Sequence, residues 1–216
     1  MDFQLLKEKQ RTLRSQFNDN LALRVHRALS WLHKAELSKG DLDAQFIFLW
    51  ISFNAAYSQD MDIARLTETE SFQMFVEKLC ELDKSEAIYC MLWDEFSTNI
   101  RLLINNQYVF QPFWEYHNKH ISENDWKSRF TSAKIAANKA LAAGDSPTVL
   151  GIILARLYTL RNQLVHGGAT WQSSANRDQL KEAVKFLAKL MPLLINIMMD
   201  NPDTLWGDAN YPVISS

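Results

Sequence analysis

The chain is poor in the residues that interrupt or cross-link a backbone. Its 216 residues include six glycines, five prolines and two cysteines. So little Gly and Pro disfavours a loop-rich or low-complexity chain, and two cysteines are too few for a disulfide framework. Cys80 and Cys90 form no Cys-x-x-Cys pair, so we expect reduced thiols that pack in helical segments. Gly-rich phosphate loops and a Ser-His-Asp signature are missing as well.

Long apolar runs are also missing. Hydrophobic residues make up 47% of the chain, but they come in short runs that charged residues interrupt. The first four residues, Met-Asp-Phe-Gln, do not begin as a signal peptide does. We therefore expect a cytoplasmic protein without a membrane span. The length suits one core, so we predict a single helical domain over residues 1–200 and an extended tail over residues 201–216.

The apolar residues recur mostly at intervals of three and four, which predicts an all-helical fold. The segment that begins at Asp41 is apolar nearly all round, so we expect it at the centre of a helical bundle. Further helices are expected from Asp19 towards Gly40 and over residues 68–82, 86–104 and 123–142. Residues 108–126 fit either a broken helix or an ordered loop.

Two further helices complete the expected fold. Ser146 is suited to cap a helix whose first residue is Pro147. A last long helix follows, with Ser173 or Ser174 as its expected cap. The first of these two helices ends in the segment that carries the main functional signal of the sequence.

That segment is RNQLVH, residues 161–166, followed by Gly167 and Gly168. An arginine can stabilise the added negative charge of a pentacoordinate phosphate, and an imidazole, with an ordinary pKa of about 6.5, can take or give a proton. Such a pair can cleave RNA without a metal. The candidate catalytic residues are therefore Arg161, Asn162 and His166. The same residues are also typical of an ordinary helix end, where a His meets the negative end of the dipole and a Gly stops the helix.

The formal charge of −2 hides two regions of opposite sign. Residues 41–125 carry five Lys and Arg against fifteen Asp and Glu, whereas residues 126–189 carry ten against three. A basic region can guide RNA, or its cations can be the solvated faces of helices. The residues that we expect to bind RNA are Arg156, Arg177, Lys181 and Lys185. Three tryptophans near this region fit either base stacking or core packing, namely Trp114, Trp126 and Trp171.

The motif resembles that of the HEPN domain, a helical bundle whose ribonuclease members carry an Arg, four to six variable residues and a His. A polar residue often follows the Arg, as Asn162 does here. The central apolar helix, and the order of a motif-bearing helix before one long helix, also resemble this family and its Apea-like branch over about residues 41–200. The resemblance implies a metal-independent endoribonuclease without a cofactor, acting as a homodimer with both motifs in one cleft. Some toxins of the family carry a Tyr where this chain has Gly168.

Helix geometry also favours a shared site. At 100° per residue, Asn162 and His166 lie on one face, whereas Arg161 and His166 differ by about 140° around the axis. A twofold axis would bring the Arg of one chain beside the His of the other. RNA and a second copy of the chain are thus the expected partners, with a regulatory protein as a third. The alternative functions are a HEPN-like RNA-binding or protein-interaction module of a defence or stress system, without turnover, and a plain helical scaffold.

A metal site is the remaining candidate in the sequence. His117 and His120 lie near Glu115 and Glu123, a spacing that fits metal ligation if the segment is helical. Exposed polar residues at this spacing are more common than ligands, so we interpret the segment as polar surface and expect no metal.

Overall fold

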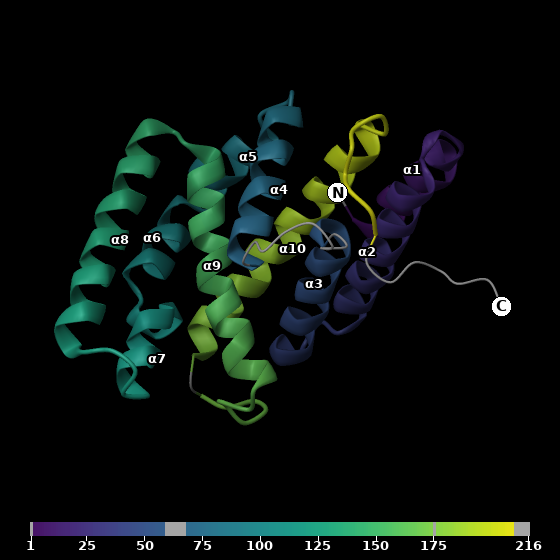
Figure 1. Ribbon diagram of the computed structural model, residues 1–216. Helices are drawn as coiled ribbons and strands as arrows, with labels where there is room; N and C mark the ends of the chain where they lie inside the picture. Colours follow the sequence, from purple (N-terminus) through teal and green to yellow (C-terminus); the bar gives the residue numbers. More distant parts are fainter. Residues whose placement is uncertain (1, 59–67, 175, 210–216) are drawn as a thin grey trace.

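The computed structural model describes residues 2–58, 68–174 and 176–209 of the chain. These residues form helices joined by short connections and no strand, which confirms the predicted all-helical fold (Figure 1). The helices are α1 (Phe3–Leu13), α2 (Asp19–Leu37), α3 (Leu42–Tyr57), α4 (Glu68–Leu82), α5 (Ala87–Cys90), α6 (Ser97–Asn105), α7 (Gln111–His117), α8 (Glu123–Ala143), α9 (Ser146–Val165) and α10 (Arg177–Asp200). None of the helices in the described part of the chain is long and apolar enough to cross a membrane.

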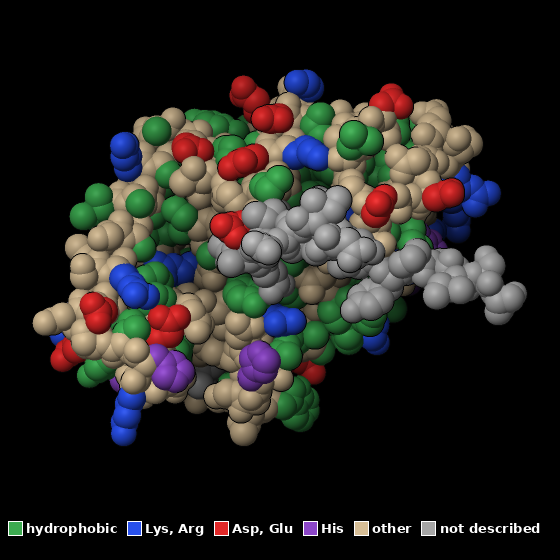
Figure 2. Space-filling model, in the orientation of Figure 1, with side chains coloured by type: hydrophobic (Ala, Val, Ile, Leu, Met, Phe, Trp, Pro, Cys, Tyr) green, Lys and Arg blue, Asp and Glu red, His purple; other side chains and the backbone are tan. Residues whose placement is uncertain are grey.

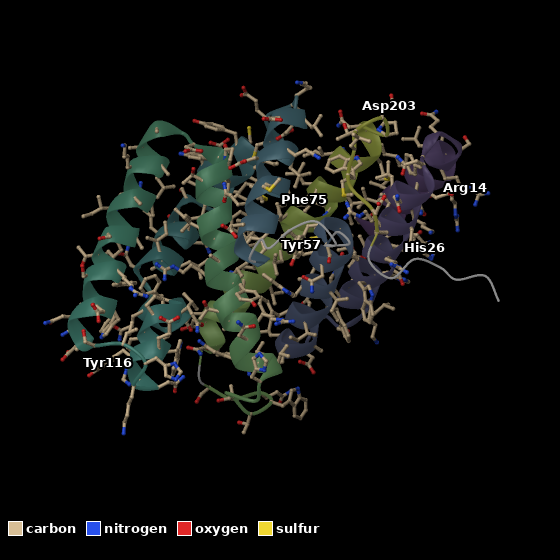
Figure 3. All side chains as sticks on the ribbon, viewed as in Figure 1. Arg14, His26, Tyr57, Phe75, Tyr116 and Asp203 are labelled. Atoms are coloured by element: carbon tan, nitrogen blue, oxygen red, sulfur yellow. The ribbon has the colours of Figure 1, made fainter. Side chains whose placement is uncertain are left out.

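No residue of helix α3 is exposed, as its all-round apolar surface predicts. It begins at the cap Asp41, whose side chain accepts a hydrogen bond from the Ala44 amide. Helices α2, α4, α9 and α10 pack around it. Tyr57 at its end faces Phe75 of α4, with ring centroids 6.3 Å apart (Figure 3). Helix α3 is therefore an interior helix that packs mainly against α2 and α10.

The expected apolar stripes are buried. On α2 the stripe consists of Leu21, Val25, Ala28, Leu32 and Ala35, all of which are buried. The Asn18 side chain caps α2 by accepting a hydrogen bond from the Leu21 amide. Helix α4 has the predicted bounds, and α8 differs from the prediction by one residue at its end. Periodicity thus located these helices correctly.

The predicted caps of the last two helices are wrong. The cap of α9 is Asp145, whose side chain accepts a hydrogen bond from the Thr148 amide, and Ser146 is already helical. The residue before α10 is Asn176, which has a left-handed backbone with φ of 57° and makes no side-chain cap. Ser173 and Ser174 lie earlier in the connection. Several residues able to cap stand side by side at each position, and the path of the chain selects among them.

The helix predicted over residues 86–104 is interrupted. A π-helical turn at Met91–Glu95 separates α5 from α6, and the Phe96 amide donates to the Met91 carbonyl five residues back. The extra residue turns Phe96 so that its ring meets the ring of Phe186 edge-on at 5.4 Å. In the ambiguous stretch after residue 106, the structure has a 3₁₀ turn at Gln107–Val109 followed by α7.

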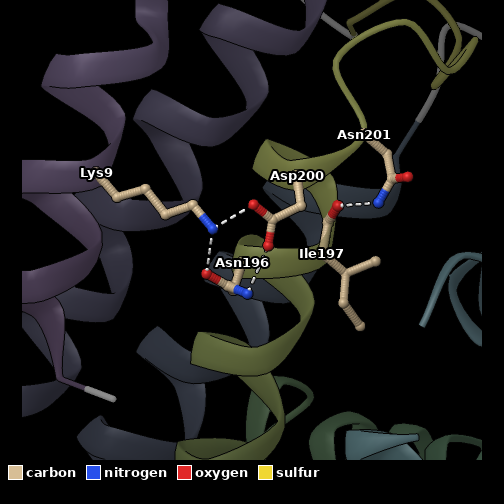
Figure 4. A network of polar contacts seen from close by, with 5 residues as sticks. All are labelled: Lys9, Asn196, Ile197, Asp200 and Asn201. Atoms are coloured by element: carbon tan, nitrogen blue, oxygen red, sulfur yellow. Dashed lines mark hydrogen bonds and ion pairs between the residues drawn. The ribbon is translucent and has the colours of Figure 1, made fainter. Parts of the chain in front are cut away.

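The first helix, α1, lies outside the helices that the periodicity predicts. It is joined to α10 by a polar network, shown in Figure 4. Lys9 of α1 donates to the side chains of Asn196 and Asp200, and Asn196 also donates to Asp200 at 2.9 Å. Helix α1 therefore belongs to the bundle.

The residues after α10 pack against the bundle. Buried Arg24 of α2 donates to the carbonyl oxygens of Trp206 and Ser58. The Trp206 ring lies 5.9 Å from the Phe75 ring of α4. Residues 201–209 are thus held on the surface of α2 and α4, and the rest of the predicted tail lies outside the described residues.

The two cysteines have different environments. Cys80 is half-buried, and its burial raises the pKa of its thiol to about 12. Cys90 is exposed, so the prediction that it packs in the interior is wrong. Both thiols are free.

The cap of α9 gives a direct test of the fold. Asp145→Ala removes the hydrogen bond to the Thr148 amide and should lower the free energy of unfolding by about 1 kcal/mol. Ser146→Ala is the matched control and should change it by less than about 0.5 kcal/mol. Urea unfolding followed by circular dichroism measures both. A larger loss in the Ser146 variant would contradict the assignment of the cap.

Candidate functional site

The motif lies at the exposed C-terminal end of α9. His166 is the last residue of the helical turn, and its amide donates to the Asn162 carbonyl at 3.0 Å. Gly167 follows with a left-handed φ of 72°, and the Gly168 amide donates to the Gln163 carbonyl at 2.7 Å. The two glycines therefore end the helix, as predicted. Histidine side chains are visible at the lower edge of the molecule in Figure 2, where α7 and the end of α9 lie.

Within one chain, the structure joins two of the three motif side chains. The Arg161 guanidinium donates to the Asn162 side-chain oxygen at 2.9 Å and lies 5.8 Å from the centre of the Tyr158 ring. Arg161 and Asn162 are half-buried, whereas His166 is exposed. Among the described residues, no hydrogen bond links the imidazole of His166 to either side chain. The Arg and Asn thus form a fixed pair beside a solvent-facing His.

Arg156 does not lie on the surface, which corrects its prediction as an RNA-binding residue. Its side chain is 4% exposed, and its guanidinium carbon lies 4.3 Å from the ring centre of Phe110 and 5.6 Å from that of Phe130. Burial lowers its pKa to about 10. Arg156 therefore fills a slot between aromatic rings, where its charge interacts with their π faces.

The other three predicted RNA-binding residues share one face of α10, because they are four residues apart. Arg177 forms an ion pair with Asp43 of α3 at 2.8 Å, and Lys185 pairs with Glu182 at 2.7 Å. Lys181 is exposed and forms no ion pair with any described residue. Of these three cations, Lys181 is thus the one whose charge no carboxylate of the described residues neutralises.

Gln163 has a structural role that the sequence does not reveal. Its side chain donates to the Tyr108 carbonyl at 2.6 Å and accepts from the Asn176 side chain at 2.7 Å. Its own carbonyl accepts from Gly168. It therefore ties α9 to the connection before α7 and to both ends of the loop that follows the motif. Gln163 occupies a variable position of the motif, so no pattern singles it out.

The structure separates the three candidate tryptophans. Trp126 is buried at 8% exposure, and Trp114 is half-buried and donates to the Tyr108 carbonyl at 2.8 Å. Trp171 is 69% exposed, and its indole N–H donates to the Asp41 carboxylate at 3.0 Å. Hydrogen bonds from the Ala44 amide and then from Trp171 lower the pKa of Asp41. The carboxylate that holds the indole is therefore charged at neutral pH.

The histidines at the end of α7 and just after it do not form a metal site in the described residues. His117 and His120 are exposed, and Glu115 faces Arg129 at 3.5 Å. No three His, Cys, Asp or Glu side chains of the described chain converge as metal ligands do.

We compared the chain with protein-family models, curated proteins and solved structures, and none of them matched.

The role of Gln163 can be tested by hydrogen exchange. Gln163→Leu removes two side-chain hydrogen bonds, of which the one from Asn176 closes the loop, so the amides of residues 167–176 should exchange about fivefold faster. Gln111→Leu, at an exposed position of α7, should leave the loop unchanged. Mass spectrometry of the peptide that covers the loop makes the measurement. Equal protection in the two variants would show that Gln163 does not close the loop.

Proposed function

We propose that the protein is a metal-independent endoribonuclease of the HEPN type, with an active site shared across a homodimer. The observation that carries the proposal is the end of α9. It presents an exposed His166 imidazole one helical turn from the fixed Arg161–Asn162 pair. The family motif supports the assignment, because Arg161, Asn162 and His166 stand in its order and spacing.

The chemistry uses the 2′-hydroxyl of the ribose. His166 accepts its proton while the 2′-oxygen attacks the adjacent phosphorus. The bond from phosphorus to the 5′-oxygen then breaks, and the leaving oxygen takes a proton from a second His166 or from water. The products are a 2′,3′-cyclic phosphate and a 5′-hydroxyl. DNA lacks the attacking hydroxyl and is not a substrate.

The pair beside the histidine has the groups that this reaction needs. The Arg161 guanidinium stabilises the phosphorane, which gains negative charge as the 2′-oxygen attacks. The oxygen of the Asn162 side chain accepts from Arg161, so its amide N–H groups are left to donate to a phosphate oxygen or to the imidazole. Lys181 adds an unneutralised positive charge to the nearby face of α10 and can contact the RNA backbone.

The same geometry favours a homodimer over a single-chain site. Arg161 turns towards Asn162 and Tyr158, and no described contact brings it to His166. A second copy related by a twofold axis can place its Arg161 opposite this imidazole.

The rival function comes from the same observation. If Arg161 stays bound to Asn162, the surface can bind RNA or a regulatory protein without turnover, as a module of a defence or stress system. Binding of RNA by a chain that never cleaves it distinguishes this module from the enzyme.

Cleavage of labelled mixed-sequence RNA in EDTA tests the enzyme. His166→Ala should slow cleavage about 10²- to 10⁴-fold and Arg161→Ala about 10²- to 10³-fold, because each removes a group needed in the transition state. His26→Ala is the matched control, since His26 is exposed on α2 (Figure 3) and should be replaceable without loss. Analysis of the product ends should show cyclic phosphate. Equal rates in wild type and His166→Ala would point to a contaminating nuclease and defeat the proposal.

Mixing two inactive variants tests the shared site. In an equal mixture of Arg161→Ala and His166→Ala chains, half of the dimers combine one chain of each kind, and each has one site with both residues intact. About a quarter of the wild-type activity should therefore return. Each variant alone, at the same total concentration, is the control. A mixture as inactive as its components would contradict a site that works with the Arg161 of one chain and the single His166 of the other.

A further inference from the structure

Both ends of the loop between α9 and α10 are hydrogen-bonded to one residue, Gln163. Gly168, near its start, donates to the Gln163 carbonyl, and Asn176, at its end, donates to the Gln163 side chain. Two of its residues, Gln172 and Asn176, have left-handed backbones with φ of 55° and 57°, which non-glycine residues adopt rarely. These hydrogen bonds and backbone angles hold the described residues of the loop, 167–174 and 176, in a defined shape. It lies at the lower end of α9 in Figure 1.

Trp171 is the large side chain that this loop presents to solvent. An indole normally contributes to stability through burial, but Trp171 is 69% exposed. Its N–H is bonded to Asp41, whose other carboxylate oxygen caps α3 by accepting from the Ala44 amide. The edge of the ring is therefore fixed to the bundle while its surface remains open. The fixed indole therefore offers its ring surface to a ligand, as tryptophan side chains at interfaces do.

The open aromatic surface lies in the connection that begins directly after His166. A flat π face binds another flat ring, and base–aromatic stacking contributes substantially to the affinity of single-stranded RNA sites. Bases within a duplex are stacked on each other and cannot lie on the indole. The neighbouring α10 carries Lys181, whose charge suits a phosphate backbone better than an apolar protein partner.

We propose that Trp171 is a stacking platform for one unpaired base of an RNA strand whose phosphate reaches the end of α9. This inference rests on the proposed function for the identity of the ligand, and it restricts the substrate to single-stranded RNA. Trp171 contributes to RNA binding only, and the proposed catalytic roles stay with Arg161 and His166. Its exposure means that replacement should not disturb the core.

The test measures binding separately from cleavage. All chains carry His166→Ala, and fluorescence anisotropy follows a labelled 12-nucleotide single strand and a blunt duplex of the same sequence, in EDTA. Trp171→Ala should weaken binding of the single strand about 5- to 150-fold and leave the duplex unchanged. Trp171→Phe keeps a π face and should restore most of the affinity. Thermal unfolding of each variant verifies that the bundle is intact.

Tyr89→Ala is the matched control. Tyr89 is an exposed aromatic at 41%, and it lies beside Gly144 at the opposite end of α9, about 30 Å from the motif for a helix of 20 residues. The Tyr89→Ala variant should bind the single strand and the duplex with the same affinity as the chain that carries His166→Ala alone. An unchanged affinity of Trp171→Ala for the single strand, an equal loss for strand and duplex, or failure of the parent chain to bind the single strand would each overturn the platform.

The outcome is separable from that of the nuclease proposal. If Trp171→Ala selectively loses single-strand binding but the wild type never cleaves RNA, the stacking proposal stands and the nuclease proposal is refuted. If the wild type and a Trp171→Ala variant with His166 intact cleave RNA at equal rates, the stacking proposal is refuted and the nuclease proposal stands.

Discussion

Helix α3 is stable only when other helices cover it, because its apolar side chains extend almost all the way round. Phe46, Trp50 and Phe53 are buried on one face of α3, and Ile47 and Ile51 on its other side are half-buried. Helices α2, α4, α9 and α10 provide the cover. Helix α9 packs mainly against α4, α8 and α6 and contacts α3 over a smaller area. This packing leaves the last turn of α9 beyond the covered region, where the motif meets solvent. The exposure of His166 thus follows from the length of α9 relative to the core it packs against.

Two arginines show how the interior uses charge. Arg24 and Arg156 are nearly inaccessible, and burial lowers the pKa of each to about 10, so both remain charged at neutral pH. Neither forms an ion pair with a described carboxylate. Arg24 instead donates to main-chain carbonyl oxygens, and Arg156 lies against the rings of Phe110 and Phe130. A guanidinium can be held in this way because it is planar, has several donors and is less strongly hydrated than an ammonium. Among the described residues, the Nε of Arg24 and one terminal nitrogen of Arg156 nevertheless have no hydrogen-bond partner.

The sequence predicted the helices where burial determines them, since a buried stripe repeats over several turns. It did not predict features that depend on the path of the chain. Asp145 and Ser146 are both able to cap a helix, and only the backbone at Asp145 decides between them. The π-turn before Phe96 inserts one residue without changing the apolar character of the segment. Arg156 was assigned to the surface because its partners, Phe110 and Phe130, are far from it in sequence.

The sequence indicates which residues belong to the candidate site, but not the hydrogen bonds that connect them. The motif residues and the glycine stop can be found by spacing, because chemistry restricts them to few residue types. Gln163 is different, since many residues are tolerated at the surface of a helix end. Its role exists only because Tyr108, Gly168 and Asn176 converge on it in space. Trp171 could be named as a candidate, but only its 69% exposure distinguishes it from Trp114 and Trp126.

The location of the proposed site at a helix C-terminus sets an electrostatic condition. The unpaired carbonyl groups there give the negative end of the helix dipole, which repels a phosphate. An RNA site at this end therefore needs cations that outweigh the dipole. In one chain, Arg177 is neutralised by Asp43, whereas Arg161 keeps its charge beside the neutral Asn162 side chain and Lys181 pairs with no described carboxylate. A second chain related by a twofold axis would bring another Arg161 to the same phosphate and add to these charges. Two chains would therefore offset the helix dipole more fully than one, independently of the angle between Arg161 and His166.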